Sequence, residues 1–338
     1  LEVKLETADL DELQHHAVIR QKAHFRIAET HIQTGRYVEG RAAFARYVSL
    51  FPEGDAWASA QRGIINAEYS LGRQHEAEQD WSAASATYTQ FLADHPLDTR
   101  VREILYRLGD LHSQRAKALQ GESAETSSAK VDLYESAIGE WQRLIAKYPA
   151  SNEASHALYS TGVLRESELD DLEGAVESYR ACNFGEYQGS ADEHLRAMVK
   201  PRLAINTERV WRSNESASLE LELRNVKSVM VEVYQLDLEA YFRKHLSISN
   251  IEDLDLDLIA ADQEFEYAIE EFDRFRPYTK QIDLPVEGVG VWAVVVSSKE
   301  KRATTLVMLS DLEIIVKSSR ESAFIFAEDM LKMKGASG

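Results

Sequence analysis

The hydrophobic positions of roughly the first 195 residues follow a helical period, and the pattern recurs along the chain. Three prolines, Pro52, Pro96 and Pro149, close segments that share one spacing. An aromatic residue lies eight positions before each proline, a small residue twelve before it, and a second aromatic fifteen before it. In chain order these residues are Tyr37, Gly40 and Phe44, then Trp81, Ala84 and Tyr88, then Tyr134, Ala137 and Trp141. Residues three and four apart share a helix face, so each segment predicts a helix with an aromatic–small–aromatic stripe.

A partner helix is predicted in front of each stripe, over residues 25–33, 64–71, 104–112 and 154–164. A fourth stripe continues with Leu172, Ala175 and Tyr179, and Tyr187 stands where its proline would be. The stretch from Gln120 to Lys130 is rich in Ser, Ala and Glu and predicts a mobile loop inserted in the third repeat. The pattern as a whole predicts an all-helical repeat domain over residues 1–198.

The period changes to two after Pro201, which ends the last predicted helix. Seven short runs alternate apolar and polar residues, and they are 203–207, 219–223, 229–234, 265–269, 280–284, 289–296 and 304–309. Runs of this kind, separated by polar turns, predict an antiparallel β-sandwich over residues 199–310. Residues 236–246 predict a short helix at the edge of a sheet.

The last residues add two further strand-like runs, 312–316 and 323–326. Two strands are marginally stable on their own. We therefore interpret residues 311–338 as the first strands of a second, incomplete β domain, and we expect the sequence to be the N-terminal part of a longer protein. The predicted fold class is multidomain, with a helical solenoid first and β-sandwich structure after it.

The helical repeats resemble the tetratricopeptide repeat, in which a Leu-Gly pair is followed by an aromatic-x2-Ala-x3-aromatic stripe and a proline. Leu71-Gly72 and Leu108-Gly109 stand where that family has its Leu-Gly pair. The resemblance covers roughly residues 20–190, although the prolines lie 44 and 53 residues apart, more than in the family's shorter unit. It implies stacked hairpins with a concave groove for a peptide or a helix. The competing interpretation is that the stripe only packs the repeats and that the protein's own β domain fills the groove.

Four phrases in the second half resemble the macroglobulin-like domains near the N-terminus of bacterial alpha-2-macroglobulin family proteins. They are residues 207–215, 233–243, 284–292 and 303–311, which include Val210-Trp-Arg-Ser-Asn-Glu215 and Ala303-Thr-Thr-Leu-Val-Met-Leu-Ser-Asp311. In full-length members this resemblance implies capture of attacking proteases through a bait segment, often with a thioester built on Cys-x-Glu-Gln. The single cysteine, Cys182, lies in Ala-Cys-Asn-Phe-Gly instead, and we interpret it as a small buried residue. No residue of this chain is therefore assigned the trapping chemistry.

Composition excludes several other functions. The net charge is −19, which argues against binding to nucleic acid or to anionic lipid, because both need clustered Lys and Arg. One cysteine cannot form a disulfide within the chain or a cysteine-based zinc site. No apolar run reaches the length of roughly 18 residues that a membrane span needs.

Candidate metal and catalytic motifs are weak. Asp253, Asp255, Asp257 and Glu264 resemble the acidic spacing of a calcium loop, but Leu258 stands where the sharp turn needs glycine, so a solvated acidic edge is the favoured interpretation. The histidines at positions 15, 16, 24 and 31 lack the His-Glu-x-x-His pattern of zinc enzymes. Gly288-x-Gly290 predicts a turn before a strand, and not a phosphate loop. The sequence predicts no enzyme, no cofactor and no metal site.

These observations lead to one hypothesis and two alternatives. The hypothesis is a non-catalytic protein-interaction region of an alpha-2-macroglobulin-like protein of the bacterial periplasm, cell envelope or extracellular space. Its partner would be a protein or peptide in the repeat groove, and a protease for the full-length protein. The candidate groove contacts are Arg26, Glu29, Glu68, Arg107 and Asp110. The alternatives are a structural cell-surface adaptor without a protease-inhibitor role, and a hydrolase or lectin carried by the β domain.

Overall fold

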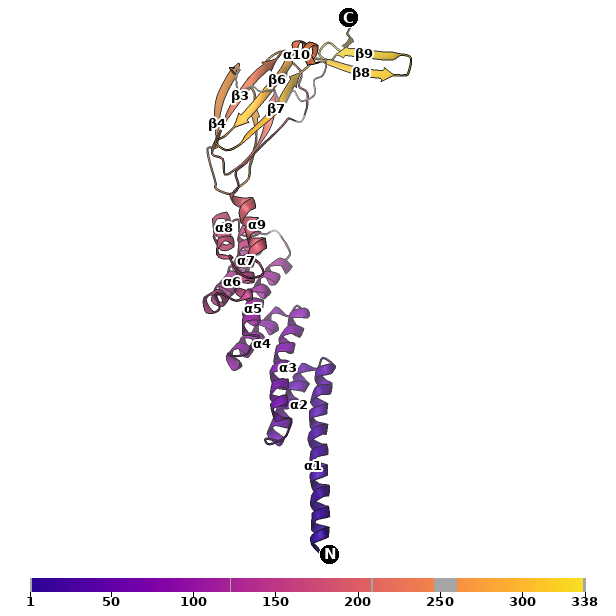
Figure 1. Cartoon of the computed structure of the whole chain (residues 1–338), viewed down its shortest axis with the longest axis vertical. Helices are drawn as coiled ribbons and strands as arrows, with labels where there is room; N and C mark the ends of the chain where they lie inside the picture. Colours follow the sequence, from indigo (N-terminus) through magenta and orange to yellow (C-terminus); the bar gives the residue numbers. More distant parts are fainter. Residues whose placement is uncertain (1, 122, 208, 246–259, 337–338) are drawn as a thin grey trace. The chain divides into compact units, whose positions relative to one another are not determined.

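The computed structural model describes residues 2–121, 123–207, 209–245 and 260–336, and the chain divides into two compact units, Leu1–Asp192 and Glu193–Gly338 (Figure 1). The first unit consists of antiparallel helical hairpins, and the end of its last helix lies in the second unit. Its helices are α1 (Glu2–Gln33), α2 (Tyr37–Leu50), α3 (Trp57–Ala77), α4 (Trp81–Asp94), α5 (Val101–Ala118), α6 (Ala124–Lys147), α7 (Asn152–Ser167), α8 (Leu172–Ala181) and α9 (Gln188–Val199). The second unit is built from antiparallel sheets. The predicted fold class is thus confirmed.

The predicted stripe forms the core of the repeats. Tyr88, Trp141 and Tyr179, the last aromatic of the second, third and fourth stripes, are at most 2% exposed. Each of these rings lies against a glycine of the preceding helix: a Cβ added at Gly72 would lie 2.4 Å from the Tyr88 ring, and one at Gly109 would lie 2.4 Å from Trp141 Nε1. Gly162 and Tyr179 repeat this arrangement at the same distance. The Leu-Gly pair of the repeat therefore exists because a large ring occupies the space where a side chain would be.

The third repeat corrects one prediction. The loop expected over residues 120–130 is wrong from Ala124 onward, because α6 begins there and continues to Lys147. Ser123 caps the helix, since its side chain accepts a hydrogen bond of 3.1 Å from the backbone N–H of Thr126. Glu125 in the first turn adds a favourable interaction with the helix dipole. The composition of this stretch suits a helix start as well as it suits a loop, and the cap decides between them.

The β-sandwich has two antiparallel sheets, in the strand orders β1-β2-β5 and β4-β3-β6-β7. The seven predicted strands are present, each end within two residues of its expected position. They are β1 (Arg202–Asn206), β2 (Ser218–Arg224), β3 (Ser228–Leu236), β4 (Gln263–Ala268), β5 (Tyr278–Asp283), β6 (Gly290–Ser297) and β7 (Arg302–Leu309). Alternate residues of β2, Leu219, Leu221 and Leu223, are buried in the core between the sheets. The predicted edge helix is α10 (Leu238–His245).

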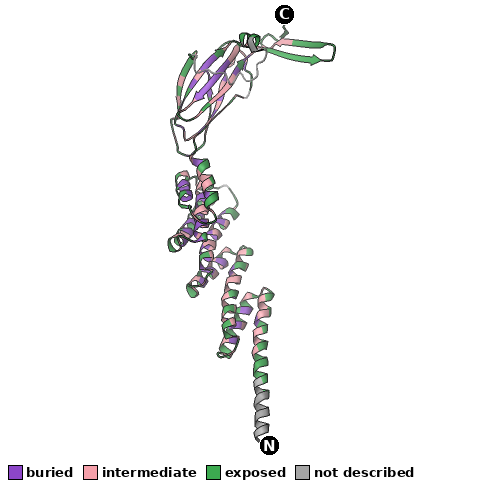
Figure 2. Ribbon diagram, in the orientation of Figure 1, coloured by how far each residue is buried: buried purple, intermediate pink, exposed green. Residues whose placement is uncertain are grey.

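A separate three-stranded sheet follows the sandwich. It consists of β8 (Leu312–Ser318), β9 (Ala323–Asp329) and β10 (Lys334–Gly335), in the order β10-β9-β8. Figure 2 shows most of β8 and β9 as exposed. The strand register places Leu312, Ile314, Val316 and Ile325 on one face of this sheet, and all four are about half exposed or more. The assignment of residues 311–338 to a second β domain stays a prediction.

The calcium-like run and the Gly288 turn lie partly or wholly within the described residues. Asp253, Asp255 and Asp257 of the calcium-like run lie outside the described residues, and Glu264 is an exposed residue of β4. Gly288 has a φ of +77° in the turn before β6, as its turn prediction requires. Within the described ranges, no three His, Cys, Asp or Glu side chains group as metal ligands do, and none of the helices is long and apolar enough to cross a membrane.

Candidate protein-interaction face of the repeat array

Charged and aromatic side chains join α3 to α5 along one side of the repeats. Arg107 on α5 binds Glu76 on α3 at 3.0 Å and Glu103 on its own helix at 2.8 Å. The hydroxyl of Tyr69 on α3 donates to Glu103 at 2.8 Å. Burial raises the pKa of Glu103, but the hydrogen bonds from Tyr69 and Arg107 outweigh it, so the net pKa is lowered. Glu103 is therefore ionised and held at the contact between repeats.

Arg100, between α4 and α5, ties this group to the α3–α4 hairpin. Its guanidinium lies over the rings of Tyr69 and Phe91, 5.0 Å and 5.3 Å from their centroids, and donates to Asn66 at 3.0 Å. Asp98 holds the same guanidinium through its carboxylate, and the Arg100 hydrogen bond lowers the pKa of Asp98 to about 2. The side chains on this side of α3 are thus fixed in place before any ligand arrives.

A stack of aromatic rings continues the same side to α7. The ring of Tyr106 lies parallel to Trp141 at 5.8 Å and to His156 at 4.0 Å. His156 in turn lies 3.9 Å from the ring of Tyr187, and Tyr187 lies 5.4 Å from Tyr159. Burial lowers the pKa of His156 to about 4, so its imidazole is neutral at pH 7 and pairs with the Tyr106 hydroxyl at 2.8 Å. The α7 end of this side is therefore lined by aromatic rings, with a neutral imidazole among them.

These residues recur at one position of the repeat. Tyr69, Tyr106 and Tyr159 each stand three residues before the glycine of their hairpin, at Gly72, Gly109 and Gly162. We call the side of α3, α5 and α7 that carries these three tyrosines the first-helix face. All three are half-buried, unlike the fully buried rings of the stripe. Tyr69 and Tyr106 also pack against the core clusters of the repeats, and each keeps part of its surface exposed.

The opposite side of α3 has a small pocket. It has a volume of about 290 Å³ and is lined by Arg41, Glu68, Leu71, Ala86, Thr87, Gln90 and Phe91. Glu68 is fully engaged there, because Arg41 and His95 each bind its carboxylate at 2.6 Å. Helical spacing places Leu71 nearly opposite Tyr69 on α3, whereas Glu68 lies about 100° around the helix from Tyr69. The pocket adjoins the first-helix face at Phe91, whose ring lies against Tyr69 and under the Arg100 guanidinium.

The five residues predicted to contact a ligand fall in three places. Arg107 and Asp110 come together on α5 beside Tyr106, and burial raises the pKa of Asp110, which accepts a hydrogen bond from Gln114. Glu68 lies in the pocket on the other side of α3. Arg26 and Glu29 form an exposed ion pair of 2.7 Å on α1. The sequence prediction missed the tyrosines and His156. The fixed distance of each tyrosine from its hairpin glycine is a signal that could have found the tyrosines, but it does not indicate His156.

Cys182 lies at the end of α8 and is fully buried. Its thiol lies 3.3 Å from the carbonyl oxygen of Ser155, to which it donates, and burial raises its pKa. A raised pKa keeps the thiol protonated at neutral pH and therefore unreactive as a nucleophile. This environment fits the packing interpretation.

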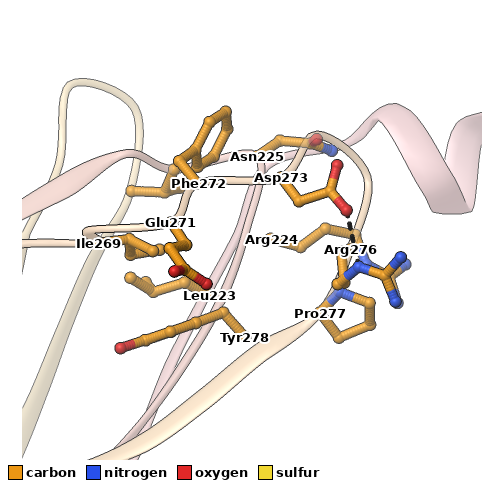
Figure 3. A pocket seen from close by; sticks show the side chains of 11 residues that line it. Leu223, Arg224, Asn225, Ile269, Glu271, Phe272, Asp273, Arg276, Pro277 and Tyr278 are labelled. Carbon is orange, nitrogen blue, oxygen red and sulfur yellow. Dashed lines mark hydrogen bonds and ion pairs between the residues drawn. The ribbon is translucent and has the colours of Figure 1, made fainter. Parts of the chain in front are cut away.

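The β unit has a small cavity at the turn between β2 and β3 (Figure 3). Its volume is about 30 Å³, room for about one water molecule. Asn225 in this turn donates to the carbonyl of Met198 at 2.6 Å and accepts from the backbone N–H of Phe275 at 2.8 Å, while Arg224 donates to the carbonyl of Ala197 at 2.9 Å. These bonds satisfy carbonyls at the C-terminus of α9. The cluster is a helix cap and offers no room for a ligand.

Comparison with known proteins gives one family match. A family model described as an outer membrane lipoprotein, YfiO, matches residues 19–179, which lie within the repeat unit. The sequence has no significant match among curated proteins.

Solved structures give distant similarities to both halves. Native alpha-2-macroglobulin from Escherichia coli, over domains MG0-NIE-MG1, is 15% identical with a TM-score of 0.31, over 40% of this chain and 48% of that one. A tetratricopeptide repeat protein from Parabacteroides merdae is 14% identical with a TM-score of 0.33, over 52% and 59% of the two chains. A putative protein binding protein from Bacteroides ovatus is 11% identical with a TM-score of 0.29, over 52% and 94%. The chain therefore spans about half of the alpha-2-macroglobulin structure and three fifths of the first repeat protein.

Proposed function

We propose that this chain is a non-catalytic scaffold of the bacterial cell envelope that binds a segment of a partner protein on its first-helix face. One observation carries the proposal: each of three successive hairpins presents a half-buried tyrosine at the same position, so that partly exposed aromatic side chains recur along one face. Tyrosine offers a large, rigid contact area with a polar tip, which is why it is enriched at protein interfaces. The envelope location is supported by the match of residues 19–179 to the lipoprotein family model.

The charges on the face favour a partner that contacts tyrosines over one that forms ion pairs. Arg107 is neutralised by Glu76 and Glu103 within the protein, and breaking such a half-buried arrangement to bind a charged ligand costs free energy. Around Tyr159 and Tyr187 the described contacts are stacked rings, with the neutral imidazole of His156 among them. We therefore place the main contact at α7 and at the turn that follows α8.

The β unit adds a second part to the proposal. Its sandwich, and the apolar sheet that follows it, support a macroglobulin-like module of a protease-trapping assembly, in which the repeats would dock another component. The structural adaptor without an inhibitor role is the alternative. The two differ in one assay: the full-length protein slows cleavage of a large protein substrate by a protease if it traps proteases, and leaves that cleavage unchanged if it is an adaptor.

Replacing Tyr159 by serine tests the binding face. We expect Tyr159→Ser to reduce retention of specifically bound envelope proteins on the immobilised chain by tenfold or more, since one central aromatic can carry about 2 kcal/mol or more of binding. Retained proteins are quantified by mass spectrometry, and a thermal melt confirms that the variant is folded. Tyr148→Ser is the matched control, because Tyr148 is a half-buried tyrosine at the end of α6, away from this face. Equal retention by both variants and by the native chain would refute the assignment.

A further inference from the structure

The turn between α8 and α9 is fastened to two adjacent residues of α7. The Ser155 hydroxyl donates to the carbonyl of Phe184 at 2.7 Å, and its oxygen accepts a hydrogen bond of 3.3 Å from the backbone N–H of Tyr187. Gly185 approaches so closely that a Cβ there would lie 2.7 Å from Cβ of Ser155, and its φ of +72° also favours glycine. The carbonyl of Tyr187 then accepts the first helical hydrogen bond of α9, from Ala191. The start of α9 therefore depends on how this turn is held.

His156 holds the other side of the turn. Its ring is nearly parallel to that of Tyr187, with an angle of 6° between them, and its opposite face lies on Tyr106. Its Nε2 lies 2.8 Å from the Tyr106 hydroxyl oxygen, and in the tautomer that carries its proton on Nδ1 this nitrogen accepts the hydroxyl proton. The Tyr106 oxygen also lies 3.2 Å from the Ser160 hydroxyl, which is the alternative partner of that proton. The stack thus places the imidazole of His156 between two tyrosine rings.

We propose that His156 and Tyr187 form an acid-sensitive latch, in which protonation of His156 releases the turn over residues 183–187 and the first turn of α9 from α7. Protonation makes both ring nitrogens of His156 hydrogen-bond donors, so that Nε2 no longer accepts the Tyr106 hydroxyl proton. It also places a positive charge in a half-buried site. The groups that face the ring are Tyr106 from α5, with Trp141 of α6 behind it, Ser160 from α7 and Tyr187 from the turn, and all of them are uncharged at neutral pH. Asp110 on α5 lies beyond Tyr106, whose pKa it helps to raise after the larger effect of burial.

The direction of the effect follows from the two pKa values. In the closed latch burial lowers the pKa of His156 to about 4, whereas a solvated histidine titrates near pH 6.5. Between pH 4 and pH 6.5, His156 therefore binds more protons in the released state than in the closed latch. The free energy that favours the closed latch falls as the pH falls from about 6.5 toward 4. Between pH 7 and pH 5 the full shift would favour release on the order of twentyfold, and partial exposure of the ring reduces this toward fivefold.

Hydrogen exchange of the intact chain tests the latch. The protection factors of the Tyr187 and Ala191 amides should fall five- to twentyfold between pH 7 and pH 5, while those of the buried α5 core stay constant. His156→Phe keeps a flat ring in the stack but cannot be protonated, so it should abolish the fall. His112→Phe is the matched control, because burial also lowers the pKa of His112, which lies on α5 away from the turn. That variant should leave the fall intact.

An NMR titration of His156 in the native chain gives an independent result if a variant fails to fold. We expect its ring protons to titrate well below pH 6. A pKa at or above 6.5 would mean that stacking on the tyrosines stabilises the charged ring, and it would overturn the latch. Protection factors that do not change with pH, or a fall that persists in His156→Phe, would also overturn it.

Discussion

Replacing Gly109 by valine is expected to destabilise the repeat unit by about 3 kcal/mol, because there is no room for a side chain at this position. A Cβ at Gly109 would lie 2.4 to 2.8 Å from three atoms of the Trp141 indole. The indole cannot move away easily, since its Nε1 donates to the carbonyl of Tyr106 at 2.9 Å and the side chain is buried. Urea denaturation followed by far-ultraviolet circular dichroism measures the loss.

A neighbouring glycine provides the matched control for this prediction. Gly139 on α6 has no atom within 4 Å of where a Cβ would lie. Gly139→Ala should therefore stabilise the helix by about 0.5 to 1 kcal/mol, because alanine loses less backbone entropy on folding. Gly109→Val combined with Trp141→Leu should recover part of the lost stability, as the smaller side chain makes room. If Gly109→Val is as stable as the native chain, the close contact between ring and glycine does not exist.

Replacing two exposed isoleucines on the sheet of β8 and β9 by lysine is expected to abolish self-association of the chain. Ile314 and Ile325 lie on the same face of that sheet and are 58% and 65% exposed, beside the exposed side chains of Leu312 and Val316. An exposed apolar patch of this kind drives association in water. Sedimentation velocity should therefore show a mass that rises with concentration for the native chain, and a constant mass near 38.2 kDa for the variant Ile314→Lys with Ile325→Lys.

The control for this experiment adds the same charge elsewhere. Val38 and Val131 are isolated exposed valines on α2 and α6. Val38→Lys with Val131→Lys should leave the association unchanged, because neither residue belongs to the apolar sheet. A native chain that stays monomeric at high micromolar concentration would show that the exposed face of this sheet does not mediate self-association.

The sequence predicts the core of this protein well because the core depends on spacing. The stripe that contains Tyr88 and Trp141 is periodic, and the structure buries it as the period requires. The alternation of Leu219, Leu221 and Leu223 likewise fixes which face of β2 is inside. Both patterns lie within one helix or one strand, so the sequence of that segment is enough to detect them.

Features that depend on distant residues are harder to predict. The contact of Glu68 with a ligand stays a prediction, and the sequence does not show that Arg41 and His95 engage its carboxylate. The stack around His156 unites α5, α6, α7 and a turn, and no spacing within one segment indicates it. The start of α6 depended on one hydroxyl, at Ser123, within a stretch whose composition also suits a loop. These features depend on a partner side chain in another segment or on a single capping residue. The local pattern of the sequence contains neither.

The most direct test of the scaffold proposal is site-specific photo-cross-linking in the cell that produces the protein. A photoreactive phenylalanine analogue replaces Tyr159 or Asn66 on the first-helix face, or Glu173 on α8 and Glu39 on α2 as controls. The account predicts discrete adducts with the same partner protein from Tyr159 and Asn66, and none from the two control positions. Adducts from the control positions only, or from all four positions equally, would contradict it.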